Sequence, residues 1–216
     1  AIKTRIMRGQ ATPTGLMTAP GTNGFVAELN GRYPVDIPGA KKLLADAGYA
    51  NGFEVEMDCP NDRYVNDEAI CQAVVAMLSQ IGIKVNLLAQ TRARYFAKVL
   101  GPGYNTSFFM LGWTPGATYD VHNVFEQIMQ TRGGGKGGFN LGNYSNKAFD
   151  DLANKIEQET DKAKRDAMIV EAHKIHKEEF GHIPLHQQAV VWAARDNIEL
   201  TQLADNFFPL RYVRVK

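Results

Sequence analysis

The chain has 216 residues, enough for one sizeable hydrophobic core or two modest ones. Its 24 basic and 23 acidic residues leave a net charge of +1, and 44% of its residues are hydrophobic. Nucleic-acid and anionic-membrane surfaces normally show as clustered Lys and Arg, so this balance disfavours both partners. No apolar run reaches the length of a membrane span, and we therefore expect no membrane insertion.

The first ten residues, AIKTRIMRGQ, contain neither an initiating Met nor a signal peptide. The stretch AIKTRIM is typical of the end of a helix that starts further upstream. We therefore expect the chain to be a piece of a longer polypeptide, with any export signal upstream of it.

The sequence contains two cysteines, Cys59 and Cys71. In a reducing cytosol they would be two free, small apolar side chains. In an oxidising compartment they could pair across the short loop between them. Their spacing gives no metal-binding motif, and the choice between free thiols and a disulfide depends on where the protein resides.

Residues 8–38 are rich in Gly, Pro and Thr, which predicts a long stretch of loops. After them, strands and helices alternate. The period-2 alternation of FEVEMDC predicts a strand. Apolar residues recur at helical spacing from Ile70 to Ile81, in a helix that Asn66 is placed to cap. The elements expected here are strands at 53–59, 83–90 and 104–113, and helices at 38–49, 66–82 and 91–100.

This alternation predicts an α/β fold with a largely parallel, mixed sheet flanked by helices. The strand at 104–113 is apolar on both sides, as expected where helices cover both faces of a sheet. The second half of the chain is mainly helical. We expect helices at 118–131, 145–160 and 161–180, a loop at 132–144, and strands at 183–195 and 207–215.

The glycine-rich stretch RGGGKGG does not meet the requirements of a phosphate-binding loop. In that motif a Ser or Thr follows the lysine at the start of a helix, whereas Gly137 follows Lys136 here. We therefore interpret the stretch as a mobile surface loop.

His173 and His176 lie three residues apart on one predicted helix, a spacing that would suit two metal ligands. The HExxH zinc motif is absent, and His176 lies beside the apolar stripe of its helix. We therefore predict hydrogen-bonded interior imidazoles and no metal site.

A nucleophile elbow of the form GxSxG is absent from the sequence. An α/β hydrolase that pairs His122 or His186 with a serine is therefore the less favoured alternative. We expect a binding protein that is not an enzyme and that carries no cofactor.

Loops at the carboxyl ends of strands are where ligands bind in open α/β sheets. The loop after the first strand carries Arg63 and Tyr64. Arg63 would offer a forked donor to a ligand carboxylate. The alternative is a structural ion pair between Arg63 and Asp58 or Asp62.

The loop after the third strand carries Trp113, Thr114 and Asp120. The indole of Trp113 would offer a flat wall for a ligand, or it would cap the end of the sheet, and the two roles are compatible. Asp120 would offer a counter-charge for an amine. Thr114 and Tyr64, together with Asn140 from the glycine-rich loop, complete the candidate ligand-binding residues.

Several segments together resemble the extracytoplasmic solute-binding proteins of ABC importers, in the dipeptide/oligopeptide-binding group known as family 5. They include AKKLLADAGYANGFEVEM, AICQAVVAMLSQIGIKVNL and FFMLGWTPGATYD, and the long stretch from GNYSNKAFDDL to IPLHQQ. The ending DNFFPLRYVRVK matches as well. The resemblance extends from about Tyr33 to the end of the chain.

The resemblance implies the C-terminal lobe of a two-lobe periplasmic-binding-protein architecture. Residues 1–32 would be a hinge-proximal segment, 33–196 the ligand-binding lobe, and 197–216 a tail that returns towards the missing N-terminal lobe. The implied partners are a small peptide or other small solute, that missing lobe, and the permease subunits. The implied location is the periplasm, with the signal peptide upstream of this fragment.

In this family an acidic residue shortly after the Gly-Trp pair anchors the amino terminus of the peptide. Pro115 and Gly116 occupy those positions here, and Asp120 follows later. Either Asp120 serves in that role, or the ligand is not a free-amine peptide. The resemblance allows nickel, haem, glutathione, an opine or an oligosaccharide on the same scaffold.

Overall fold

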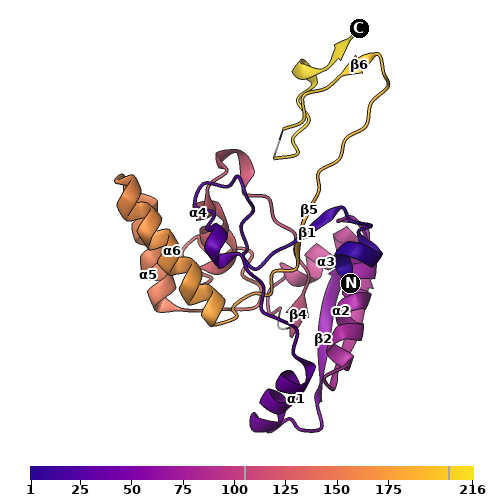
Figure 1. Ribbon diagram of the computed structural model, residues 1–216, viewed down its shortest axis with the longest axis vertical. Coiled ribbons are helices and arrows are strands. Elements are labelled where there is room, and N and C mark those ends of the chain that lie inside the picture. The colour runs from indigo at the N-terminus through magenta and orange to yellow at the C-terminus, as the bar shows by residue number, and fades with distance from the viewer. Residues whose placement is uncertain (105, 204) are drawn as a thin grey trace.

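A computed structural model describes residues 1–104, 106–203 and 205–216 (Figure 1). Its central sheet has three parallel strands in the order β3-β2-β4. The strands are β2 (Phe53–Pro60), β3 (Ile83–Gln90) and β4 (Phe108–Phe109), and the connecting helices are α2 (Asp67–Ser79) and α3 (Arg92–Val99). The prediction of an α/β lobe with a parallel sheet is confirmed.

The two connecting helices cover opposite faces of this sheet. Successive residues of a strand point to opposite faces, and Asp58 and Cys59 are neighbours on β2. The side chain of Asp58 meets Lys98 of α3, whereas Cys59 is bonded to Cys71 of α2. This arrangement follows from right-handed crossovers that run first to one side of β2 and then to the other.

The third strand is much shorter than the expected span of 104–113, in which Asn105 lies outside the described residues. β4 pairs only with Met57 and Asp58, and the Met110 N–H adds one more bond to the Asp58 carbonyl. Beyond this point the Met110 carbonyl accepts a hydrogen bond from the hydroxyl of Tyr95, at 2.6 Å. A side chain therefore takes the place of the next strand partner, and the ladder ends.

A helical layer packs beside the sheet domain (Figure 1). It contains α4 (Val121–Val124), which continues as a π-helical turn at Phe125–Met129, then α5 (Lys147–Gln158) and α6 (Lys162–Glu178). The earlier helix α1 (Ile37–Asp46) has Pro38 in its first turn, as expected. The core of the helical layer is fully buried and is formed by Val121, Phe125, Ile128, Phe149, Ala153, Ile156, Ile169 and their neighbours.

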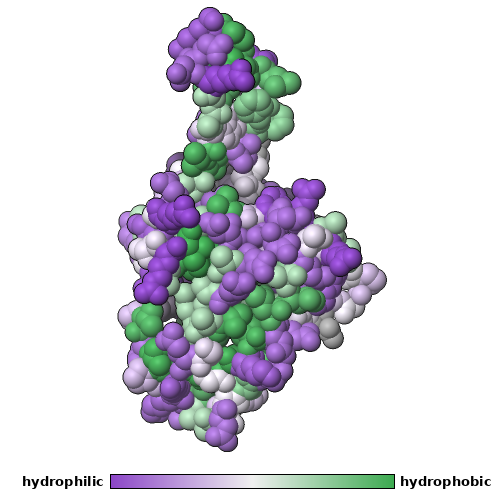
Figure 2. Space-filling view, turned by 90° about the vertical axis from the view of Figure 1, so that its right-hand side faces the viewer, coloured by the Kyte–Doolittle hydropathy of each residue, from purple (hydrophilic) through white to green (hydrophobic). Residues whose placement is uncertain are grey.

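Two short strands pair a segment near the beginning of the chain with a segment that follows α6. β1 (Ala11–Pro13) pairs antiparallel with β5 (His186–Gln188). The predicted strand at 183–195 is wrong in length, because β1 offers only three residues for pairing. After β5 the chain leaves the body as a long arm (Figures 1 and 2).

The arm ends in a small hairpin of β6 (Ile198–Glu199) and β7 (Arg214–Val215). The strand expected at 207–215 is therefore reduced to two residues, and a short 3₁₀ turn at Leu210–Tyr212 precedes it. Large apolar side chains of the arm are exposed, namely Val191, Phe207, Phe208, Leu210 and Val215. Exposed apolar groups at this density are typical of a surface that another part of a protein covers.

Two histidines, His173 and His176, are buried where α6 meets the loops around it, and a third, His182, is partly buried beside them. The Nε2 atom of His173 lies 3.2 Å from the Gly24 carbonyl oxygen, and the Nε2 atom of His176 lies 2.8 Å from Nδ1 of His182. Within residues 1–104, 106–203 and 205–216, no group of three or more His, Cys, Asp or Glu side chains is placed to hold a metal ion. The helices in those ranges also include none that is long and apolar enough to cross a membrane.

Burial lowers the pKa of His176 to about 3, and the pKa values of His173 and His182 to about 4. In the unfolded chain these groups titrate near 6.5. The unfolded state therefore binds more protons as pH falls below 6.5, and stability is lost from there down to about pH 4.

We expect the free energy of unfolding to fall by about 2 kcal/mol for each of these three histidines between pH 7 and pH 5. Urea unfolding across this range, followed by far-ultraviolet circular dichroism, measures the slope. The variant His182→Asn removes one titrating group, and its slope is expected to be about one third smaller. An unchanged slope in this variant would contradict the assignment.

Asp58 offers a second test, because its side chain is buried and pairs with Lys98 at 2.8 Å. Lys98→Met removes the cation and leaves a buried carboxylate, at an expected cost of about 2 kcal/mol of unfolding free energy. Lys84→Met is the matched control, because Lys84 forms an exposed pair with Glu54 on the same sheet. Its loss should cost at most about 0.5 kcal/mol. Equal losses of unfolding free energy in the two variants would show that the buried pair stabilises the fold no more than the exposed pair does.

Candidate functional site

The two loops predicted to carry the site leave the same edge of the sheet. β2 and β4 are parallel, so their carboxyl ends lie side by side. The hydroxyl of Tyr64, in the first loop, donates to the carbonyl of Gly112 in the second, at 3.2 Å. A Cβ atom on Gly112 would lie 2.8 Å from the Tyr64 ring, so only glycine permits this contact. The two loops therefore form one continuous surface.

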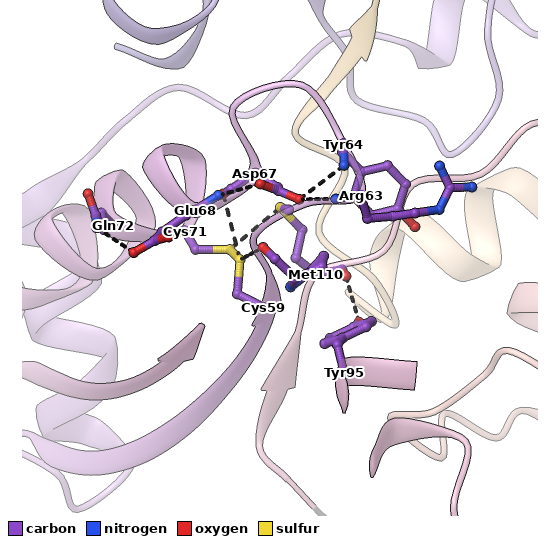
Figure 3. Close-up of a disulfide and its surroundings, with 10 residues drawn as sticks. Cys59, Arg63, Tyr64, Asp67, Glu68, Cys71, Gln72, Tyr95 and Met110 are labelled. Atoms are coloured by element: carbon purple, nitrogen blue, oxygen red, sulfur yellow. Dashed lines mark hydrogen bonds between the residues drawn. A yellow bond between two sulfur atoms is a disulfide. The ribbon is translucent and has the colours of Figure 1, made fainter. Parts of the chain in front are cut away.

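The first loop is held by the buried carboxylate of Asp67. One oxygen of that carboxylate accepts the backbone N–H groups of Arg63 and Tyr64, at 2.9 and 3.0 Å, and the other accepts the N–H of Glu68 (Figure 3). Asn66, predicted to cap α2, has a left-handed backbone, and its amide bonds the carbonyl of Ile6. In place of Asn66, the Asp67 side chain accepts a backbone N–H of the first helical turn, that of Glu68.

The guanidinium of Arg63 makes no ion pair within the described ranges. The residue is exposed, and its Cζ lies 4.8 Å from the centre of the neighbouring Tyr64 ring. The two acids considered as its partners are engaged elsewhere. Asp58 pairs with Lys98, and Asp62 accepts the backbone N–H of Arg92 at the start of α3. In Figure 3 the Arg63 side chain points away from the disulfide and α2. The structure therefore favours a guanidinium that is free to meet a ligand over a structural ion pair.

Trp113 packs against the helical core and keeps part of its ring at the surface. Its indole Nε1 donates to the side-chain oxygen of Asn123 at 2.8 Å, and its ring lies 4.8 Å from that of Phe139. The next residue, Thr114, is exposed. The bond from Nε1 to Asn123 and the contact with Phe139 fix the orientation of the indole.

Asp120 is committed to the fold. One carboxylate oxygen accepts from the His122 N–H at 2.8 Å and from Arg165 at 2.7 Å, and the other accepts from the Asn23 amide at 2.6 Å. Burial alone would raise the pKa of Asp120, but the bonds from Arg165, His122 and Asn23 outweigh it and hold the pKa below its usual value. The residue is an ionised N-cap of α4 whose charge Arg165 neutralises.

Asn140 was predicted as a ligand contact, and the structure contradicts this. The residue is fully buried, and its amide nitrogen donates to the carbonyls of Gln130 and Tyr144 at 2.9 and 2.7 Å. Its amide oxygen accepts the N–H of Tyr144 at 3.0 Å. With both ends of the side chain satisfied internally, Asn140 closes the loop and does not face solvent.

The glycine-rich loop at 132–138 is more firmly held than a mobile surface loop. Lys136 donates to Asn154 at 2.6 Å and to Glu157 at 3.0 Å, both on α5. The Gly137 N–H donates to the Glu126 carbonyl at 2.7 Å. The loop thereby places Phe139 against Trp113, a contact that the sequence did not reveal.

The hydrolase alternative gains no support from this geometry. His122 lies 3.8 Å from Glu157, and Nδ1 of His186 has no hydrogen-bond partner among the described atoms. Among the residues that the structure describes, no serine hydroxyl is hydrogen-bonded to His122 or to His186. Two described serines form hydrogen bonds through their hydroxyl groups, and neither partner is a histidine. Ser79 donates to a backbone carbonyl, and Ser145 is bonded to Thr131.

Comparison with known proteins gives consistent results. The sequence model of the bacterial extracellular solute-binding proteins, family 5 (middle region), matches residues 1–136. The glutathione-binding protein GsiB of Escherichia coli strain K12 is 27% identical over 193 residues, which are 88% of this chain and 37% of the relative. The chain thus spans well under half the length of the curated relatives it matches.

Two solved structures share the fold. A dipeptide-binding protein from Pseudoalteromonas sp. SM9913, in complex with Met-Leu, superposes with a TM-score of 0.85 at 22% identity, over 100% of this chain and 42% of that one. The periplasmic binding protein DppA from Helicobacter pylori, in complex with the peptide STSA, gives 0.80 at 21%, over 99% and 41%. With a family match that covers more than half of its residues, the chain belongs to the bacterial extracellular solute-binding proteins of family 5.

Proposed function

We propose that this chain is the ligand-binding lobe of the solute-capture component of an ABC importer, and that its ligand is a small peptide. The observation that carries the proposal is the presence at one sheet edge of an exposed Arg63 guanidinium, which forms no ion pair among the described residues and lies over the Tyr64 ring, and of a fixed Trp113 ring. A guanidinium suits a carboxylate, and an indole face supports flat or apolar groups. Tyr64 and Thr114 complete this wall, whereas Asp120 and Asn140 hold the loops behind it.

In this proposal the ligand lies between this lobe and an N-terminal lobe. A ligand that touches both lobes favours the closed state by its differential affinity, and permease subunits recognise that state. No covalent step is needed, so the protein acts as a binding protein without a cofactor, in the periplasm. The ladder between β1 and β5 would belong to the hinge, and residues 197–216 would dock on the N-terminal lobe through the exposed apolar groups of the arm.

A non-peptide solute on the same scaffold is the second candidate, and the state of Asp120 favours it. Its charge is neutralised by Arg165, so it does not offer a counter-charge to an amine. A solute recognised through a carboxylate and an apolar portion would suit this lobe without an amino terminus. Glutathione and an opine both carry the carboxylate, and glutathione adds a free α-amino group, whereas nickel, haem and an oligosaccharide are tested as further members of a ligand panel.

The two-lobe protein tests the proposal directly. Calorimetric titration and thermal unfolding with Met-Leu, glutathione, an opine, nickel, haem and an oligosaccharide should identify a ligand that raises the melting temperature. Arg63→Ala should weaken binding of a carboxylate ligand by about 10- to 100-fold, because a charge-assisted hydrogen bond is lost. Lys84→Ala, a change at an exposed lysine on β3, is the control and should bind as the parent does.

Two outcomes would count against this reading. A flat response to the peptides together with binding of another panel member would replace the peptide by that solute. Equal affinity of Arg63→Ala and the parent for a carboxylate ligand would remove Arg63 from the site.

Asp120→Asn separates a structural role from a ligand-binding role. The change keeps the cap on α4 but leaves Arg165 without its partly buried partner, so the free energy of unfolding should fall by about 1–2 kcal/mol. Affinity for the ligand found in the panel should stay within threefold of the parent. Full stability combined with a tenfold loss of affinity would instead make Asp120 a ligand anchor.

A further inference from the structure

We propose that the Cys59–Cys71 disulfide and Asp67 preset the ligand wall, by holding the loops of Arg63 and Trp113 as one unit before any solute arrives. This inference rests on the proposed function for its meaning, but its structural content can be measured without a ligand. It assigns a positioning role to three residues that do not touch the ligand themselves.

The disulfide closes the first loop into a ring. Cys59 lies near the end of β2 and Cys71 lies in α2, twelve residues later, and both side chains are fully buried. The ring therefore contains Arg63 and Tyr64. A loop whose two ends are fixed to a strand and a helix, and to each other, has far fewer conformations than an open one.

Asp67 fixes the direction of the backbone inside this ring. The residue is 3% exposed, and its carboxylate accepts three backbone N–H groups while forming no ion pair within the described ranges. Hydrogen bonds to an ionised acceptor are about twice as strong as neutral ones. They hold the N–H groups of Arg63 and Tyr64 inwards, so that the guanidinium is directed outwards (Figure 3).

The preset ring also contacts the second loop. Tyr64 bonds and packs against Gly112, the residue before Trp113. On the other side, the Sδ atom of Met110 lies 3.6 Å from Sγ of Cys71. The disulfide and the tyrosine thus contact the second loop at two points, Met110 and Gly112, both of which precede Trp113 in the chain. Figure 3 shows Met110 beside the disulfide.

Such an arrangement lowers the entropy that a ligand must remove on binding. Immobilising a side chain or a loop on association costs free energy, and a loop that is fixed in advance avoids part of that cost. The wall is therefore expected to depend on residues behind it as much as on Arg63 and Trp113 themselves.

Hydrogen exchange of the backbone amides tests the first loop in the chain as it stands. Asp67→Asn should speed exchange of the Arg63 and Tyr64 amides at least tenfold, because an amide group cannot accept from all three donors. Glu68→Gln is the matched control, because it alters the next acid of the same helical turn and keeps its backbone donor to Asp67. Amides of Ile156 and Ile169, in the helical core, should keep their protection in both variants.

The double variant Cys59→Ala/Cys71→Ala should also speed exchange of the two loop amides tenfold or more. Protection of the Arg63 and Tyr64 amides within twofold of the parent, in this variant and in Asp67→Asn, would overturn the proposal. Loss of protection throughout the chain in both variants would also overturn it, since the groups would then serve global stability and not the loop.

The link to the second loop has its own readout. In a Trp192→Phe background, Trp113 is the remaining tryptophan, and its fluorescence reports on its surroundings alone. Asp67→Asn and Gly112→Ala should each raise quenching of Trp113 by acrylamide at least twofold, whereas Glu68→Gln should not. Unchanged quenching in both would show that the loops are held independently. Ligand titration plays no part in these measurements, so their failure is separate from failure of the proposed function.

Discussion

The parallel pairing of β2 with β4 is the constraint on which the site depends. Parallel strands end at the same edge, so the loop after Pro60 and the loop after Phe109 leave the sheet together. The pairing extends over only two residues of β4, yet it brings the Tyr64 ring against Gly112. If β4 ran in the opposite direction, Trp113 would emerge at the far end of the sheet, and neither loop alone would form a wall.

Four aspartates near this edge each form a hydrogen bond or an ion pair with another part of the chain. Asp58 meets Lys98, Asp62 and Asp67 accept backbone N–H groups, and Asp120 meets Arg165. Each carboxylate is therefore used to end a strand, start a helix or hold a loop. In the described part of the chain the guanidinium of Arg63 has no carboxylate partner, although the exposed Asp62 precedes it, so a cationic donor stays accessible at this edge.

The sequence predicts local structure well and long-range partners poorly. The first helical turn at Pro38 and the strand at 53–59 follow from patterns within about ten residues, and the parallel sheet follows from the alternation of strands and helices. The length of β4 does not, because it is set by the Tyr95 hydroxyl from another element. Asn140 resembles a polar loop residue, and only its bonds to Gln130 and Tyr144 reveal that it is buried.

Asp67 shows why positioning residues escape a reading of the sequence. It appears as one more acid in the first turn of a helix, a position that the helix dipole favours in any case. Asp67 accepts the backbone N–H groups of Tyr64 and Arg63, which precede it by three and four residues. These bonds lie inside the loop that the disulfide closes. Neither feature alone indicates a binding function. Together they give the Arg63 side chain a direction, and under the proposed function that direction sets what a second lobe would have to supply to the same ligand.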